Sequence, residues 1–433
     1  MKAIPIQRPS CVAALLILAV TCLRSAPAQF LDQEFQVNSY TTSVQFRPNV
    51  ASDGSGNFVI VWESLQDGAS YDVFGQRFDS AGNPSGSEFR VNSYTPNSPS
   101  LPAIAVGGTG DFVVVWVSPG QDGSSSGVFG QRFDSAGSPV GGEFQVNSYT
   151  TGSQLRPRVA INGSGDFVVV WDSPGQDGSS QGVFGQRFSS AGSPVGGEFQ
   201  VNSYTTAAQY APDVAMGSLS DFVVVWESYY QDGSSHGVFG QRFNSAGIPE
   251  GVEFQVNSYT TSAQRGPVVA ADGSGNFVVA WDSSGQDGSY HGVFGQRFSL
   301  SGSPLGNEFQ VNTYTAETQY APSIAMGGSG LFLVTWASIG GQDGSFSGVF
   351  GQQFNTAGAP MGSEFQVNSY SMHSQKRPQV APDGLGRFVV VWDSYSQDGS
   401  NVGVFGRRSL GIFSDGFDLG DACAWSLAQG GGC

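Results

Sequence analysis

Cysteine is almost absent from the chain, and its absence excludes two kinds of structure. The 433 residues contain four cysteines, and none lies between Cys22 and Cys423. A disulfide framework or a metal–thiolate site is therefore excluded from the whole central part. Cys11 and Cys22 lie in an apolar N-terminal segment. We expect Cys423 and Cys433 to form a disulfide in an oxidising compartment.

Histidine is scarcer still. His236, His291 and His373 are the only three, which excludes a histidine-rich metal cluster. No nucleophile elbow or phosphate-binding loop is present either. We expect the three histidines to be solvent-exposed loop residues. The sequence therefore contains no motif that by itself predicts an enzyme.

Long apolar runs are also missing, with one exception at the N-terminus. Residues 11–22 are apolar, follow Lys2 and Arg8, and precede Ala26-Pro27-Ala28. This pattern predicts a signal peptide over residues 1–28 and a secreted protein, extracellular or in the cell envelope. The run is too short for a membrane span. Removal of residues 1–28 would leave 15 basic against 35 acidic residues, so we expect no nucleic acid partner.

A unit of about 55 residues is the main feature of the chain. It occurs seven times, and each copy opens with Glu-Phe at Glu34, Glu88, Glu143, Glu198, Glu253, Glu308 and Glu364. Each copy supplies four strand signals, which in residues 198–243 read EFQVN, PDVA, FVVVW and GVFGQRF. Gly-rich turns separate the later strands. The fold class is therefore all-β.

The spacing of the strands predicts how they are ordered. The segment between EFQVN and the proline-containing strand is long enough to cross from the outer edge of one sheet to the inner edge of the next. We therefore expect a seven-bladed β-propeller of four-stranded blades over residues 29–411. Residues 412–433 would form a C-terminal tail for sorting or attachment. One Trp per copy, such as Trp171, is expected in the core.

The ends of the array predict how the ring closes. The first copy begins with a strand at Glu34, whereas the seventh ends near Ser409 without an outer strand. The N-terminal strand would fill the gap beside the last blade. A solenoid would need no such arrangement. We expect the protein to be a monomer.

The candidate ligand-binding residues lie in loops that should gather on one face. They are the aspartates of seven Gln-Asp-Gly loops and tyrosines of the adjoining linkers: Asp67, Asp122, Asp177, Asp232, Asp287, Asp343, Asp398, Tyr149, Tyr204 and Tyr259. Asp-Gly is also favourable turn chemistry, which is the leading interpretation of these loops. Calcium, bound with help from backbone carbonyls, is an alternative, and no other cofactor is expected.

Other charged residues are expected to be structural or isolated. The arginines of the FGQRF strands, Arg77, Arg132, Arg187, Arg242 and Arg297, should pair with the glutamates that open the next outer strand, and Gln353 replaces the sixth. Asp72, Asp213, Glu250 and Glu317 are acids that interrupt the repeat, and nothing in the sequence pairs them.

The strings VVVWDSPGQDGSSQGVFGQRF and GGEFQVNSYTT resemble repeats of large secreted or surface bacterial proteins of the adhesin-like and RTX types. The resemblance implies a surface role and carries no activity. We predict a non-enzymatic module that binds a glycan, a cell-surface protein or another envelope component. The alternative is an extracellular carbohydrate-active hydrolase with acids from several blades, among them Asp213, Glu250 and Glu317, meeting over the channel.

Overall fold

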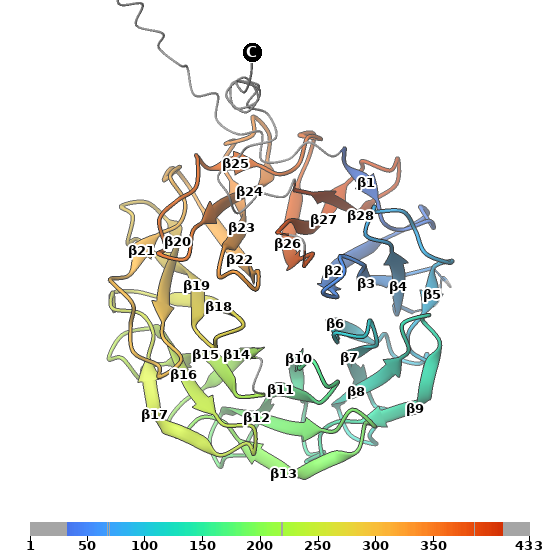
Figure 1. Ribbon diagram of the computed structural model, residues 1–433, viewed down its shortest axis with the longest axis horizontal. Helices are drawn as coiled ribbons and strands as arrows, with labels where there is room; N and C mark the ends of the chain where they lie inside the picture. Colours follow the sequence, from blue (N-terminus) through green and yellow to red (C-terminus); the bar gives the residue numbers. More distant parts are fainter. Residues whose placement is uncertain (1–32, 67, 69, 218–219, 385, 410–433) are drawn as a thin grey trace, which may run out of the picture.

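The computed structural model describes residues 33–409, except residues 67, 69, 218–219 and 385. The expected signal peptide, the C-terminal tail and the disulfide between Cys423 and Cys433 lie outside the described residues. Among the described residues, 28 strands form seven four-stranded antiparallel sheets, and there is no helix. Figure 1 shows the sheets arranged as blades around a central axis, so the predicted seven-bladed propeller is confirmed.

Each blade has the predicted strand order. The inner strands are β2 (Gln45–Ser52), β6 (Ser100–Val106), β10 (Leu155–Ile161), β14 (Gln209–Met216), β18 (Gln264–Ala271), β22 (Gln319–Met326) and β26 (Gln375–Pro382). The second strands are β3 (Phe58–Ser64), β7 (Phe112–Pro119), β11 (Phe167–Pro174), β15 (Phe222–Tyr229), β19 (Phe277–Ser284), β23 (Phe332–Ile339) and β27 (Phe388–Tyr395). We number the blades one to seven from β2 to β26.

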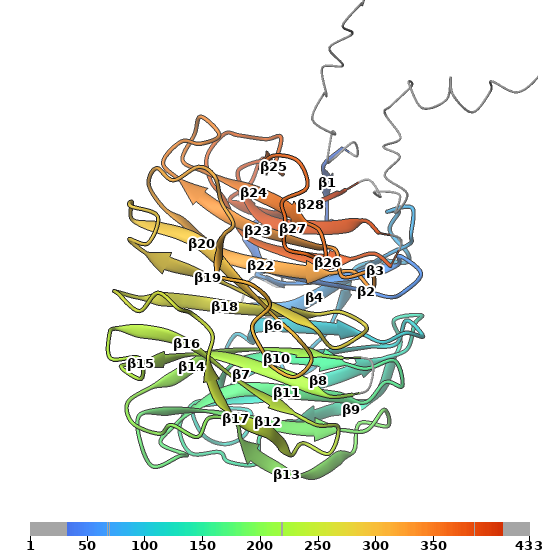
Figure 2. The same ribbon diagram turned by 60° about the vertical axis from the view of Figure 1, so that its left-hand side comes forward.

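The two remaining strands of each blade lie further from the axis. The third strands are β4 (Asp72–Phe78), β8 (Ser126–Phe133), β12 (Gln181–Phe188), β16 (His236–Phe243), β20 (His291–Phe298), β24 (Ser347–Phe354) and β28 (Val402–Arg408). The outer strands are β5 (Phe89–Arg90), β9 (Pro139–Gln145), β13 (Pro194–Gln200), β17 (Pro249–Gln255), β21 (Phe309–Gln310), β25 (Phe365–Gln366) and, in blade seven, β1 (Phe35–Gln36). Figure 2 shows the blades as separate sheets.

The N-terminal strand closes the ring, as predicted. β1 pairs with β28 in antiparallel register, with Phe35 opposite Gly406. The backbone amide of Val37 donates to the Val404 carbonyl at 2.9 Å, and the Val404 amide donates to the Asn38 side chain at 2.8 Å. First and last strands therefore share one sheet.

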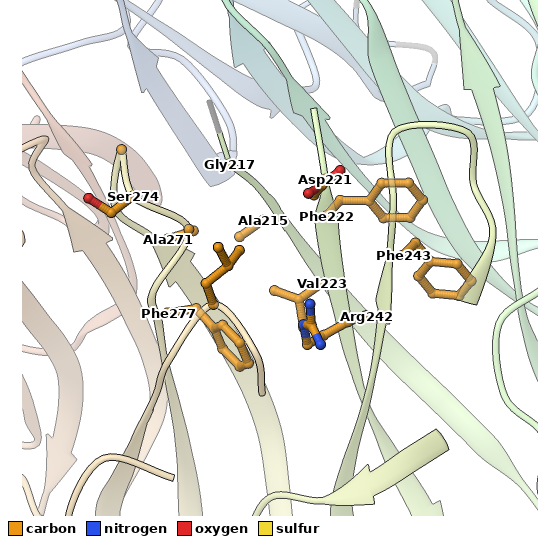
Figure 3. Close-up of a pocket in the computed structure, with 13 residues that line it drawn as sticks. Ala215, Gly217, Asp221, Phe222, Val223, Arg242, Phe243, Ala271, Ser274 and Phe277 are labelled. Atoms are coloured by element: carbon orange, nitrogen blue, oxygen red, sulfur yellow. The ribbon is translucent and has the colours of Figure 1, made fainter. Parts of the chain in front are cut away.

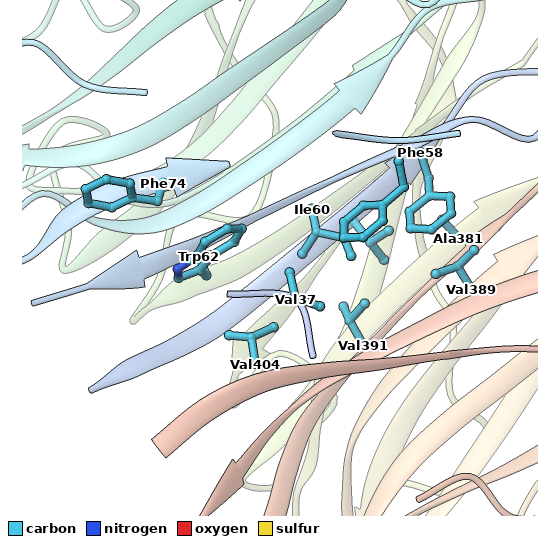
Figure 4. Close-up of a cluster of buried hydrophobic side chains, with 11 residues drawn as sticks. Val37, Phe58, Ile60, Trp62, Phe74, Ala381, Val389, Val391 and Val404 are labelled. Carbon is cyan, nitrogen blue, oxygen red and sulfur yellow. The ribbon is translucent and has the colours of Figure 1, made fainter. Parts of the chain in front are cut away.

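The FVVVW strands form the core because both of their faces are covered by neighbouring blades. Trp171, Val169 and Phe167 of β11 pack against Val113 and Val115 of β7 in blade two. Figure 4 shows the equivalent cluster across the closure, where Trp62 and Ile60 meet Val391 and Val404. All seven repeat tryptophans are fully buried, so their predicted place in the core is confirmed.

The two most regular strings of the repeat pack directly on each other. The ring of Phe199, from the outer strand, lies over Gly185 of the third strand, where an added Cβ would stand 2.7 Å from the ring. Phe199 also contacts the ring of Phe243 in the next blade, with centroids 5.4 Å apart. The outer strand therefore joins neighbouring blades.

The expected pairing of the FGQRF arginines with the glutamates is wrong for most blades. The Arg132 guanidinium instead donates to the Ala191 carbonyl in the turn of the next blade at 2.7 Å, and Arg187 donates in the same way to Ala246 at 2.5 Å. Only Arg242 of these arginines forms an ion pair with a glutamate among the described residues, and its partner is Glu250 at 2.6 Å. These arginines link adjacent blades.

Candidate functional site

The linkers and the Gln-Asp-Gly loops lie on the same side of the ring, as predicted; we call this side the linker face. Ser179, in the loop between β11 and β12, donates to the Ala207 carbonyl of the next linker at 3.3 Å. Glu198 accepts from the side chain of Gln176 and, at 2.7 Å, from the Ser148 amide. Loops, linkers and outer strands are therefore bound together on this face.

The predicted aspartates serve their own turns. In the six loops that the structure describes, one carboxylate oxygen accepts the amide of the serine two residues later, at 2.9 Å for Asp177. The same bond is made by Asp122, Asp232, Asp287, Asp343 and Asp398. Asp67 lies outside the described residues. The carboxylates thus act separately, one in each blade.

The structure does not assemble these acids into a metal centre. Calcium takes six to eight oxygen ligands. Within the described part of the chain, no group of three or more His, Cys, Asp and Glu side chains is placed to hold a metal ion. The same residues include no helix long and apolar enough to cross a membrane. The described residues therefore contain no cluster of carboxylate ligands for calcium.

The predicted tyrosines lie in the linkers and are half-buried. Their backbone carbonyls accept hydrogen bonds from a buried asparagine two residues earlier, at 2.9 Å for Tyr149 and 2.8 Å for Tyr204 and Tyr259. The aspartates and these tyrosines are therefore spread around the linker face and do not converge on one site.

The central channel forms a large cavity lined by residues that the structure describes. Its volume is about 460 Å³, and the inner strands of all seven blades contribute to it. Four arginines line it, Arg47, Arg156, Arg158 and Arg377, together with one acid, Asp213. A smaller pocket of about 180 Å³ lies between blades four and five on the opposite face, beside Phe222 and Arg242 (Figure 3). Ligand sites commonly measure about 300–1,000 Å³, so we take the channel as the candidate site.

Sequence reasoning missed a ring of five acids in the second strands, next to the inner strands that line the channel. The residue that follows the repeat tryptophan is acidic in five blades, at Glu63, Asp172, Glu227, Asp282 and Asp393. Val117 and Ala337 stand there in blades two and six. The repeated position after the tryptophan is the sequence signal for this acid ring. All five acids are buried.

Three of these acids hold the channel arginines. Arg47 pairs with Glu63 at 3.1 Å, Arg156 pairs with Asp172 at 3.0 Å, and Arg377 pairs with Asp393. In each case the acid is buried, whereas the arginine side chain is 38–42% exposed. A buried carboxylate that is hydrogen-bonded in this way fixes the position of its guanidinium.

The same acids also clamp neighbouring blades. Asp393 accepts the backbone amide of Arg47 at 2.8 Å, and Glu63 accepts that of Leu101 at 2.8 Å. Glu227 accepts the Gly266 amide at 2.7 Å. Arg47 and Leu101 have φ angles of 52° and 54°, which residues other than glycine rarely adopt. The clamp stabilises this strained backbone at the mouth of the channel.

Burial is the largest cause of the raised pKa values in the acid ring. It raises the pKa of Asp393 to about 6, although Arg377 opposes the shift. It raises the pKa of Glu227 to about 7, with a further rise from the Asp282 carboxylate in the next blade. The pKa values of Glu63 and Asp172 are raised for the same reason. Glu227 is thus about half protonated near neutral pH.

A group of polar and aromatic side chains breaks the symmetry of the ring around Glu227. We call Tyr210, Glu227, Tyr229, Tyr230, His236 and Arg265 the blade-four cluster. The Tyr210 hydroxyl is hydrogen-bonded to Glu227. The ring of His236 lies 4.7 Å from that of Tyr229 and 6.1 Å from that of Tyr210. The hydroxyls of Tyr229 and Tyr230 are 2.8 Å apart.

The expectation of exposed loop histidines is wrong for two of the three. His291 is the first residue of β20 and is half-buried. His236 is the first residue of β16, and it is only 9% exposed. Burial and the nearby Arg265 lower its pKa, so the ring is neutral near neutral pH. Arg265 can only donate, and it lies 3.4 Å from Nδ1. The Ser235 hydroxyl also contacts Nδ1, at 2.9 Å.

Comparison with known proteins identifies the fold and no family. No family model matches the chain, and no curated protein matches it. The solved polysaccharide lyase Uly1 has a TM-score of 0.55 at 8% identity, over 89% of this chain and 100% of that chain. A protein of unknown function from Dyadobacter fermentans has a TM-score of 0.53 at 9% identity, over 88% and 98%. The propeller is what they share.

One further solved structure is more distant. It is an alpha-L-arabinanase of Penicillium chrysogenum in complex with arabinobiose, with a TM-score of 0.48 at 13% identity, over 87% of this chain and 98% of that chain.

The acids expected to meet in a hydrolase remain apart. Asp213 lies in the channel wall, where it accepts the Val269 amide at 2.8 Å. Glu250 lies in the outer strand β17 and is paired with Arg242. Glu317 lies in an exposed linker with a φ of 62°.

Proposed function

We propose that the protein recognises a polysaccharide at the mouth of the channel on the linker face, with the blade-four cluster as the main contact. The rings of Tyr229 and Tyr230 are in contact, with centroids 3.9 Å apart and planes tilted by 37°, and Tyr230 is 57% exposed. A sugar ring has an apolar C–H face and a rim of hydroxyls. An exposed tyrosine pair matches both, because each ring offers an apolar surface with a polar tip. This tyrosine pair carries the proposal.

The distribution of exposed aromatic rings supports an extended ligand. On the linker face of the described chain these rings belong to Tyr230, Tyr290 and Phe346, in blades four to six. The positions of Tyr290 and Phe346 are occupied by serine in the three preceding blades, at Ser125, Ser180 and Ser235. Exposed aromatic surface that is confined to one arc of a ring is typical of a binding surface.

The fold supports polysaccharide as the ligand class to test before proteins, because the polysaccharide lyase Uly1 shares it. The proposal includes an extracellular location, since the N-terminal segment has the pattern of a signal peptide. N-terminal sequencing of protein collected from the medium tests that location. A mature chain that still begins with Met1 would contradict it.

Binding of immobilised polysaccharides, followed by calorimetric titration of those retained, tests the proposal. Tyr230→Ala should weaken binding about tenfold, the effect of losing roughly 1.4 kcal/mol of contact. Ile248→Ser is the matched control, because Ile248 is equally exposed, at 59%, in a turn on the opposite face. Equal affinity of the two variants for every retained polysaccharide would overturn the proposal.

Cleavage of the bound chain is a second candidate, and the pKa of Glu227 favours it. A carboxyl whose pKa is raised to about 7, together with a second carboxyl, is the kind of arrangement that acid–base cleavage of a glycosidic bond uses. Glu227 and Asp282 lie in adjacent blades, and Asp282 is 3.1 Å from the His291 ring. Release of reducing ends should disappear in Glu227→Gln and persist in Asp393→Asn, the same position in blade seven. Equal loss in both variants would indicate a structural role.

A further inference from the structure

The channel exposes basic side chains, although the protein as a whole is acidic. The chain carries a net charge of −17, yet the charged side chains that line the channel are four arginines and one aspartate. Each of these arginines is also paired with an acid, Arg158 with Asp213 and the other three with Glu63, Asp172 and Asp393. The structure thus places exposed guanidinium groups, rather than a net positive charge, next to the blade-four cluster.

Three of the arginines are held so that part of each guanidinium stays available. Arg47, Arg156 and Arg377 each use Nη1 to bind their buried acid. Within the residues that the structure describes, Nε and Nη2 of these three arginines have no hydrogen-bond acceptor in the protein. A guanidinium presents its donors in a rigid fork. The free edge can therefore accept a carboxylate or a sulfate in a fixed orientation.

Aromatic rings hold the same arginines from the side. The guanidinium of Arg47 lies 5.0 Å from the centre of the Phe46 ring, and that of Arg377 lies 5.8 Å from it. Arg156 lies 5.4 Å from the centre of the Tyr210 ring. Tyr210 therefore connects Arg156 with the blade-four cluster.

The arginine pairs are not required to build a blade. Blades two and six have Leu101 with Val117 and Ala321 with Ala337 at the corresponding positions, and both blades have the same four strands as the others. Arginine and acid are absent together there. A pair that the fold can omit, and that faces a cavity where it is present, is better explained by a ligand than by stability.

We propose that Arg47, Arg156 and Arg377 bind the anionic groups of an acidic polysaccharide at the mouth of the channel. The polymer class rests on the proposed function, whereas the need for an anion rests on the arginines alone. The cavity of about 460 Å³ is within the range that binds small ligands or a few units of a polymer. Nucleic acid is disfavoured, because its higher charge density meets stronger repulsion from the acidic surface.

Titration of the full chain with three polymers tests this inference. Polygalacturonate supplies carboxylates, dextran sulfate supplies sulfates, and arabinan is neutral. We expect both anionic polymers to bind, and each of Arg156→Gln and Arg377→Gln to weaken them about tenfold. The slope of affinity against salt should fall by about one for each arginine removed. Arg132→Gln, on the opposite face, is the control and should match the unmodified protein.

Further variants separate binding from folding. Arg377→Lys keeps the charge beside Asp393, so it should melt normally and keep the salt dependence while it loses the forked contact. Anionic and neutral polymers bound with equal affinity, or equal loss in Arg132→Gln, would overturn the inference. Tighter binding of a single-stranded oligonucleotide would overturn the polymer class. If Tyr230→Ala has no effect while the arginine variants lose anionic polymers, the tyrosine site fails and the arginine inference stands.

Discussion

Removal of the N-terminal strand should open the ring at one known place. A chain that begins at Ser39 lacks β1 and leaves the outer backbone edge of β28 without a partner. It loses the two bonds to Val404, the 2.8 Å bond from Gln397 to Glu34 and the bond from the Ser369 amide to Glu34. At about 0.5–1.5 kcal/mol each, these bonds are worth roughly 2–6 kcal/mol.

Burial of the Val37 side chain, which is 5% exposed, adds about 1.5–3 kcal/mol. Ordering the strand costs conformational entropy, which offsets much of the gain. We therefore expect the truncated chain to lose about 2–4 kcal/mol of unfolding free energy, measured by chemical denaturation. The exposed edge should also promote association, which sedimentation would detect.

A synthetic peptide that covers residues 33–42 should restore the stability, because an extended peptide can pair with an open sheet edge. The control peptide carries Phe35→Ser and Val37→Ser, which removes the side chains that pack against blade one. Unchanged stability and a monomeric truncated chain would refute the reasoning, as would equal rescue by both peptides.

The remaining predictions concern the core, a loop and pH. Trp171→Ala should cost roughly 3–5 kcal/mol in chemical denaturation, because the ring is fully buried and leaves a cavity; a loss below 1 kcal/mol would contradict its core position. Gly182→Ala should cost about 1–3 kcal/mol, since the added Cβ would stand 2.7 Å from Asp177. Gly197→Ala, with nothing within 4 Å, should be neutral. A greater loss in Gly197→Ala than in Gly182→Ala would contradict this account of the loop. Because the folded state raises the pKa of Glu227 from 4.5 to about 7, ionisation opposes folding, so stability should fall by about 3 kcal/mol as pH rises through that interval. Glu227→Gln should flatten this part of the denaturation profile against pH, and an unaltered profile would show that Glu227 is not its source.

The fold could be predicted because each strand has its own local pattern. The string FVVVW is apolar at every position, which predicts a strand covered on both faces, and the missing outer strand after Ser409 predicts closure by Glu34 and its neighbours. The loops with Asp177 and its equivalents were also correctly interpreted as turns. Short-range chemistry was sufficient for these features.

The candidate site could not be predicted in the same way, because its contacts cross from blade to blade. Asp393 and Arg47 are 346 residues apart in the chain, and no pattern in one copy of the repeat pairs them. The sequence predicts that the arginines of the third strands pair with the nearest glutamate. Glu198 instead accepts a hydrogen bond from Gln176, and Arg187 donates to a carbonyl of the next blade. The sequence predicts His236 to be a loop residue, because its packing against Tyr229 depends on the register of β15 and β16.

The sequence of the repeats differs at the seam of the ring, where β1 pairs with β28. In blades one to five, an arginine of the third strand donates to the turn between the third and outer strands of the following blade, as Arg297 does to Ala357 at 2.6 Å. Blade seven takes its outer strand from the other end of the chain, so it has no such turn. The residue of blade six that would donate to such a turn is Gln353, the one member of the series that is not arginine. Arg408 of blade seven donates to the Ser80 carbonyl of blade one at 2.6 Å. In related repeat arrays, the copy that has lost this arginine should mark the blade that precedes the seam, and therefore which terminus closes the ring.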